Sequence, residues 1–119
     1  MTTATTSRLT PRAAFAALGY ALTEQPREER RDAFGRPVVT RWCRITPAAC
    51  SRIGATGEGP DDATAEERLD NDLRATLRGL LAYAEADALA AVASPRRGRE
   101  GAAAAASWRN RVRAIVGAL

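Results

Sequence analysis

The spacing of apolar residues predicts two helices in the second half of the chain. Thr64 followed by Glu67 is a capping-box pattern, which favours a helix start at that point. One apolar stripe then recurs at intervals of three and four: Leu69, Leu73, Leu77, Leu80, Leu81, Ala84, Ala88 and Val92. After an alanine run, the same spacing returns at Trp108, Val112, Ile115 and Leu119. Because the connection between these segments is short, we expect an antiparallel helical hairpin over residues 64–119.

The first half of the chain predicts one helix and one strand. Thr10 before Pro11 suits a helix N-cap, and the apolar spacing that follows extends the expected helix over 11–22. The segment 38–45 is β-branched and aromatic, as strands are. The intervening segment 26–34 could form a short helix, or it could form the first arm of a β-hairpin. We favour the hairpin, with a turn at 32–35 that places residues 27–31 opposite the strand.

Proline and glycine divide the middle of the chain. Thr46 and Pro47 repeat the cap-and-proline pattern and predict a short helix ending near Ile53. The glycines that follow predict a Gly-rich loop over 54–63. The expected organisation is therefore a single domain spanning 1–119. Its parts are an N-terminal arm (1–10), a helix with a small β element (11–53), the loop (54–63) and the helical hairpin (64–119). The expected fold class is mainly α with a small β element, or α+β.

The composition excludes most familiar catalytic chemistry. All 18 basic residues are arginine, and the chain has neither lysine nor histidine. It therefore lacks the side chain that normally titrates near neutral pH and the amine of Schiff bases and phosphate loops. Cys43 and Cys50 have no histidine to complete a zinc site or to activate a thiolate. We expect no catalytic residue, no metal, no cofactor and no enzymatic activity.

The sequence gives no sign of a membrane protein. No run of 18 apolar residues occurs, and the threonine-rich start lacks the apolar stretch of a signal peptide. We expect a cytoplasmic protein, or one that is associated with a particle assembled in the cytoplasm. Gly54 to Gly59 resembles a phosphate loop only superficially, since the lysine is missing and acidic residues follow.

Arginines gather around both tryptophans. Arg41 and Arg44 flank Trp42 on the expected strand, which is the composition of an interface hot spot, so we expect these three residues to bind a partner. A second basic group surrounds the hairpin tip and Trp108, where phosphates could be bound: Arg96, Arg97, Arg99, Arg109 and Arg113. Residues 61–90 carry a net charge of −5 (three Arg against eight acids), between basic segments on either side.

Three functions are compatible with these features. The leading hypothesis is a non-enzymatic assembly or adaptor subunit that contacts a protein partner, or further copies of itself, in a larger complex such as a virion. The first alternative is a nucleic-acid-binding accessory protein that uses the arginine clusters. The second is a small inhibitor of a nucleic-acid-handling enzyme that presents acids of 61–72 as a phosphate mimic. Phosphate-driven binding weakens steeply as salt rises, which distinguishes the first alternative from apolar docking.

Overall fold

The computed structural model describes residues 8–119 and combines three helices with one four-stranded antiparallel sheet. Of these residues, 53% are helical and 26% are in strands, so the fold is α+β with a larger sheet than the small β element expected. The elements follow in the order α1 (Pro11–Ala17), β1 (Ala21–Glu24), β2 (Glu28–Arg31), β3 (Pro37–Ala49), β4 (Arg52–Gly59), α2 (Asp62–Ala93) and α3 (Gly98–Gly117). Most of the expected N-terminal arm, residues 1–7, lies outside the described residues.

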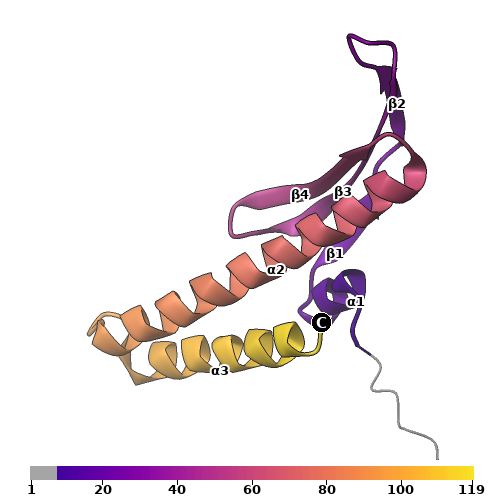
Figure 1. Cartoon of the computed structure of the whole chain (residues 1–119). Helices are drawn as coiled ribbons and strands as arrows, with labels where there is room; N and C mark the ends of the chain where they lie inside the picture. Colours follow the sequence, from indigo (N-terminus) through magenta and orange to yellow (C-terminus); the bar gives the residue numbers. More distant parts are fainter. Residues whose placement is uncertain (1–7) are drawn as a thin grey trace, which may run out of the picture.

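The long strand β3 is the centre of the sheet (Figure 1). β1 and β2 pair one after the other along one edge of β3, and β4 pairs with the opposite edge. Val39, for example, lies between Glu29 of β2 and Gly59 of β4. The turn between β2 and β3 is closed by a 3.0 Å hydrogen bond from the Gly35 amide to the Asp32 carbonyl. The hairpin interpretation of segment 26–34 is thereby confirmed.

Two predictions for the middle of the chain are wrong, namely the short helix after Pro47 and the loop at 54–63. β3 continues beyond Pro47, and a tight turn at Cys50 and Ser51, with φ angles of 49° and 69°, leads directly into β4. The strand tolerates Pro47 because the regular pairing of β3 with β4 is interrupted there. The expected loop is instead an edge strand.

The glycines of β4 belong to a strand because α2 lies directly on them. A Cβ atom at Gly57 would overlap the backbone of Ala65 and Leu69. Glycine is disfavoured in strands on propensity alone, so the close approach of the helix backbone explains its use here. The glycines that suggested a turn in the sequence are therefore needed in the fold so that α2 can pack closely on β4.

α2 begins earlier than predicted, and Asp61 rather than Thr64 is its N-cap. The Asp61 carboxylate accepts a 2.7 Å hydrogen bond from the Thr64 amide. The inward face of the helix packs on the sheet and on α1, forming a core whose larger members are Phe15, Cys43, Ile45, Leu69, Leu73 and Leu77. Truncating one such buried leucine to alanine typically costs about 2–5 kcal/mol.

α1 is shorter than the expected helix over 11–22, because it ends at Ala17. Thr10 caps its first turn as predicted. Gly19, with a φ of +90°, then turns the chain out of the helix. Leu22 consequently lies in β1 opposite Ile45, where it packs against the core from a strand instead of a helix.

α3 lies alongside the second half of α2 (Figure 1). Near the sheet, Val112 is buried and the other predicted stripe residues of α3, Trp108, Ile115 and Leu119, pack against the main core. Farther out, the contact between the two helices is a cluster of alanines: Ala88, Ala91, Ala102 and Ala105. The apolar contact at the far end of the pair is therefore made by small side chains, beside an ion pair of 2.7 Å between Arg97 and Asp87.

The molecule is flat and extended. Its radius of gyration is 18.0 Å and its thinnest dimension is 20 Å, whereas a compact chain of this length has a radius of about 13–14 Å. The β2–β3 hairpin extends beyond the end of β4, and the α2–α3 pair extends in another direction (Figure 1). Much of the surface is thus available for contacts.

Candidate interaction surfaces

The alternation of side chains along β3 separates the three predicted partner-binding residues. Arg41 lies on the same side as Val39 and Cys43, which are buried toward α2. Trp42 and Arg44 point to the opposite side, against which no helix within residues 8–119 packs. We call this opposite side the outer sheet face; its members are Val38, Thr40, Trp42 and Arg44 of β3, with Thr23, Thr56 and Glu58 of the neighbouring strands.

Trp42 lies near the middle of the outer sheet face and is only half-buried. A Cβ atom at Gly54, on the adjacent strand, would be 3.6 Å from Cε3 of the indole, so the ring lies close against the backbone of β4. On one side of the ring, Glu58 receives a 3.4 Å hydrogen bond from Thr40 and a 3.2 Å hydrogen bond from Arg30. The face therefore presents an apolar ring with a polar surround.

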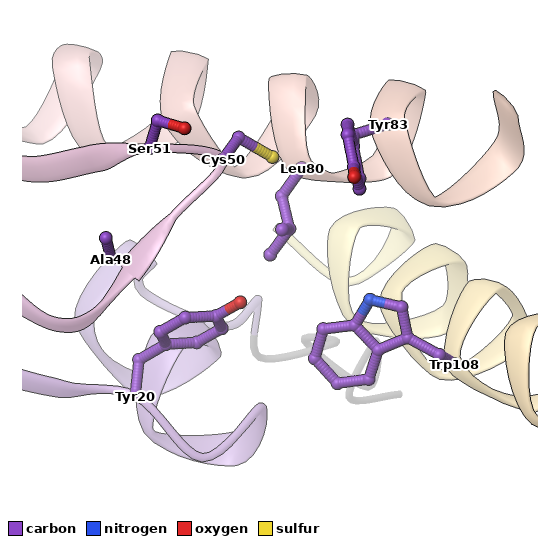
Figure 2. A pocket seen from close by; sticks show the side chains of 7 residues that line it. All are labelled: Tyr20, Ala48, Cys50, Ser51, Leu80, Tyr83 and Trp108. Atoms are coloured by element: carbon purple, nitrogen blue, oxygen red, sulfur yellow. The ribbon is translucent and has the colours of Figure 1, made fainter. Parts of the chain in front are cut away.

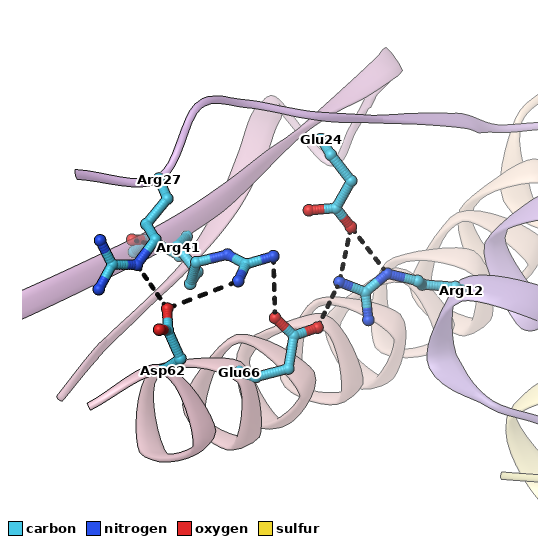
Figure 3. A network of polar contacts seen from close by, with 7 residues as sticks. Arg12, Glu24, Arg27, Arg41, Asp62 and Glu66 are labelled. Atoms are coloured by element: carbon cyan, nitrogen blue, oxygen red, sulfur yellow. Dashed lines mark hydrogen bonds and ion pairs between the residues drawn. The ribbon is translucent and has the colours of Figure 1, made fainter.

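Arg41 instead belongs to a polar network between the sheet and the start of α2 (Figure 3). Its guanidinium lies 3.5 Å from Glu66 and 3.8 Å from Asp62. The remaining members approach the same two carboxylates: Arg12 at 2.9 Å from Glu66, and Arg27 at 2.6 Å from Asp62, with Arg12 also 2.7 Å from Glu24. The network fastens the first turns of α2 to α1, β1 and β3.

The acids considered as a phosphate mimic have roles within the chain. Asp61 caps α2, and the hydrogen bond from the Thr64 backbone holds the pKa of Asp61 below its ordinary value. Asp62 and Glu66 are members of the arginine network, whereas Glu67 is exposed. Of the four acids at this helix end, one therefore caps α2 and two hold α2 against the rest of the chain.

The second arginine group is divided in the same way. Arg96 and Arg99 are exposed near the α2–α3 connection and form no ion pair within residues 8–119. The other three have partners inside the chain: Arg97 with Asp87 at 2.7 Å, Arg113 with Glu85 at 3.5 Å, and Arg109 with Asn110 at 3.1 Å. The structure does not gather all five arginines on one surface with their charges unpaired.

The two thiols lie in different environments. Cys43 is fully buried beneath α2, and Cys50 is exposed in the β3–β4 turn. Burial is the main cause that raises the pKa of each thiol above its ordinary value. Neither cysteine is therefore activated as a thiolate at neutral pH. Among the described residues, no three side chains of metal-binding type come together.

The tip of the β2–β3 hairpin is a surface that the sequence did not predict. Phe34 is 83% exposed there. The Asp32 carboxylate accepts hydrogen bonds from the amides of Phe34 and Arg36, at 2.8 and 2.9 Å, and the Arg36 guanidinium lies 5.5 Å from the centroid of the phenyl ring. These contacts fix the conformation of the turn. An aromatic residue inside a turn was the available signal.

A pocket of about 420 Å³ opens between the β3–β4 turn and the helices (Figure 2). Three of its lining residues are aromatic, and they come from the α1–β1 turn, α2 and α3: Tyr20, Tyr83 and Trp108. Burial raises the pKa of the Tyr20 phenol, which stays neutral. The sequence placed Trp108 on a core stripe but gave no sign that the tyrosines would join it.

Comparison with known proteins identifies no relative of this chain. No protein-family model, curated protein or solved structure matches the chain. None of the helices within residues 8–119 combines the length and the apolar character needed to cross a membrane. The chain's own surfaces are therefore the guide to its function.

Proposed function

We propose that this chain is a non-enzymatic assembly or adaptor subunit that binds a partner protein on its outer sheet face. The placement of the aromatic residues carries the proposal. The chain has only six, and Phe15 alone is completely buried. The other five are at or near the surface: Trp42 on the outer sheet face, Phe34 at the hairpin tip, and Tyr20, Tyr83 and Trp108 around the pocket.

Such placement favours binding over internal stability. Aromatic rings bury the largest apolar area per residue, so a small domain with few of them gains most stability by placing them in its core. This chain uses leucine and alanine there instead. Tryptophan, tyrosine and arginine are also the residues that dominate the energetics of protein interfaces. Trp42 with Arg44 is consequently the strongest candidate for an anchor.

The same proposal treats the expected antiparallel helical hairpin, residues 64–119, as a second contact region of an assembly subunit, with a virion as one such particle. Catalysis has less support, because the thiol pKa values are raised and Asp62 and Glu66 are held by arginines. Those carboxylates are poorly placed to exchange protons with a substrate.

Site-specific photocrosslinking in the producing cells tests the proposal. A photoreactive residue at Thr40, beside Trp42 on the outer sheet face, is expected to form an adduct with one defined protein. The same residue at Asn71, exposed on α2, is the control and is expected to form none. With the captured partner purified, Trp42→Ala should weaken binding at least about tenfold, as loss of an anchoring aromatic does.

Two results would overturn the proposal. One is an adduct pattern that is the same at Thr40 and Asn71, and the other is unchanged partner affinity after Trp42→Ala. Circular dichroism on the variant establishes that the fold is retained.

One observation supports the nucleic-acid alternative. Arg96 and Arg99 are exposed near the α2–α3 connection and form no ion pair within residues 8–119. If these residues bind phosphates, affinity for a DNA or RNA duplex should fall steeply between 50 and 200 mM salt, roughly as counterion release requires. Replacing both by glutamine should then reduce that salt dependence. Binding to the adaptor's partner protein should instead change little with salt.

A further inference from the structure

The pocket between the β3–β4 turn and the helices is distinguished by its lack of charge. Its volume is about 420 Å³, which lies in the range of cavities that bind small organic molecules, and all seven of its lining residues are uncharged. Two further hollows, of about 220 and 400 Å³, are each lined by at least one arginine and one carboxylate. Because the residues that line the first pocket offer a charged ligand no counter-charge, this pocket favours a neutral ligand.

Two of the aromatic rings in the pocket are held in place by other residues. Tyr20 packs edge to face against the buried Phe15, with ring centroids 5.7 Å apart and an angle of 89° between the ring planes. The Arg111 guanidinium lies 5.9 Å from the centroid of the Trp108 ring and donates a 2.7 Å hydrogen bond to the Ala17 carbonyl. These walls are therefore formed before a ligand binds, which lowers the conformational entropy lost on binding.

Hydrogen-bond donors face the interior of the pocket. The Tyr20 hydroxyl and the Trp108 indole nitrogen both point toward the space beside Leu80 (Figure 2). Burial raises the pKa of the Tyr20 phenol, so the hydroxyl keeps its proton near neutral pH and can donate. The indole N–H can only donate. A ligand that satisfies these groups therefore needs a hydrogen-bond acceptor at its edge.

The turn at one side of the pocket has an unusual backbone. Cys50 and Ser51 are the two central residues of the β3–β4 turn, and both have positive φ angles. Asparagine and glycine are the residues that normally occupy such a turn. Non-glycine residues held in this conformation are concentrated at ligand-binding and other functional sites. Here the two side chains line the pocket, and they supply a thiol and a hydroxyl.

We infer that this pocket binds a small, neutral, planar heteroaromatic molecule. Three aromatic side chains around one space favour a flat aromatic ligand, because contacts between rings add to the gain from burial. The ligand ring packs against Tyr83 and Leu80, and an acceptor atom at its edge receives a hydrogen bond from the Tyr20 hydroxyl or the Trp108 indole. The inference does not depend on the partner protein proposed for the outer sheet face.

Nuclear magnetic resonance of the full chain, labelled with ¹⁵N, tests the inference with 2-quinolinone as the probe. This compound is neutral and flat and carries a carbonyl acceptor at its edge. The chain has two tryptophans and therefore two indole N–H signals, which Trp42→Phe assigns. The Trp108 signal should shift in a saturable way with a dissociation constant of about 1 mM or lower. The Trp42 signal, on the outer sheet face, should not shift.

Two related compounds test the chemical class of the ligand. Octahydro-2-quinolinone keeps the acceptor edge but has no aromatic ring, and N-methylquinolinium keeps the flat ring but carries a permanent positive charge. Each should bind at least about fivefold more weakly than 2-quinolinone, because the first loses the contacts between rings and the second would be desolvated without a counter-charge. Equal or tighter binding of either compound would overturn the assignment of a neutral aromatic ligand.

A pair of variants on α2 tests the location of the site. Tyr83→Ala removes a ring that is 63% exposed, so the fold should be retained, and it should weaken 2-quinolinone binding at least about fivefold. Leu89→Ala removes another exposed apolar side chain of the same helix, outside the pocket, and should leave the affinity unchanged. Circular dichroism establishes that both variants are folded. Unchanged affinity in Tyr83→Ala, or no shift of the Trp108 signal in the wild-type chain at about 2 mM probe, would overturn the inference.

Discussion

At the scale of single residues, the same amino acid has different meanings in different surroundings. Gly57 and Gly59 belong to a run that suits a flexible loop, yet both are buried strand residues beneath α2. Arg41 and Trp42 are neighbours in the sequence, yet they face opposite sides of the sheet. Alternation along the expected strand could have separated them in advance, whereas the position of Gly57 could not be inferred without α2.

Gly57→Ala tests this account of β4. The added methyl group would overlap the backbone of Ala65 and Leu69, neither of which can move without displacing α2. We expect the free energy of unfolding to fall by about 3 kcal/mol or more, at the upper end of overpacking effects. Urea denaturation measures it.

Gly117→Ala is the matched control, because a Cβ atom there meets open space. Its stability should be equal to that of the wild type or higher by up to about 1 kcal/mol. Equal urea midpoints for the two variants would contradict the close approach of α2 to β4.

At the scale of elements, α2 protects the outer edge of β4 from other strands. The Thr56 amide donates a 2.9 Å hydrogen bond to Asp72, and the Glu58 carbonyl accepts one of 2.6 Å from Arg68. Arg52 also donates to Asp72 at 2.9 Å. Backbone groups that would otherwise bind an incoming strand are thereby occupied. β4 is covered by a helix on one face and blocked along its edge by side chains of that helix.

Asp72→Ala should lower the free energy of unfolding by about 1–3 kcal/mol, because the half-buried, charged carboxylate accepts hydrogen bonds from the Thr56 amide and Arg52 that the variant cannot form. It should also increase aggregation, measured by light scattering at rising protein concentration, since part of the β4 edge becomes available. Asp72→Asn retains an oxygen acceptor and should show a smaller effect in both measurements.

The control is Asp70→Ala, two residues before Asp72 on the same helix. It removes only an i,i+4 pair with Arg74, and it should cost no more than about 0.5 kcal/mol. If Asp70→Ala and Asp72→Ala destabilise the chain equally, the contact of Asp72 with the β4 edge adds no stability beyond that of a surface ion pair.

At the scale of the whole molecule, stability is expected to decrease along α2. Its first half packs leucines against the sheet and Phe15, whereas its second half contacts α3 through alanines. Alanine buries little apolar area, so the outer end of the α2–α3 pair has a weaker core of its own. The extended shape of the chain is consistent with a protein that completes its packing through contacts with other molecules.

Hydrogen exchange measures this gradient directly. Backbone amides at 88–91 and 102–105 should exchange faster than those at 69–77, because local opening of the outer end exposes less apolar surface. Equal protection of both halves would show that the alanine contacts are as stable as the leucine core.

The sequence by itself determined the elements whose signals are local. The apolar period placed α2 to within a few residues, the Thr10–Pro11 pair placed the start of α1, and the Asp32–Gly35 turn placed the β2–β3 hairpin. These succeeded because caps, turns and helical periods act over a few residues.

The tertiary structure decided everything that depends on contacts between distant segments. It made a strand of the Gly-rich segment because α2 needs room above it, ended α1 early because Leu22 pairs in β1, and brought Tyr20, Tyr83 and Trp108 around one pocket. The apolar period of α2 predicts a single stripe that ends at Val92, whereas the structure leaves Val92 exposed, together with Tyr83 and Leu89. Periodicity reports which residues are apolar, whereas the packed neighbours decide which of them remain uncovered.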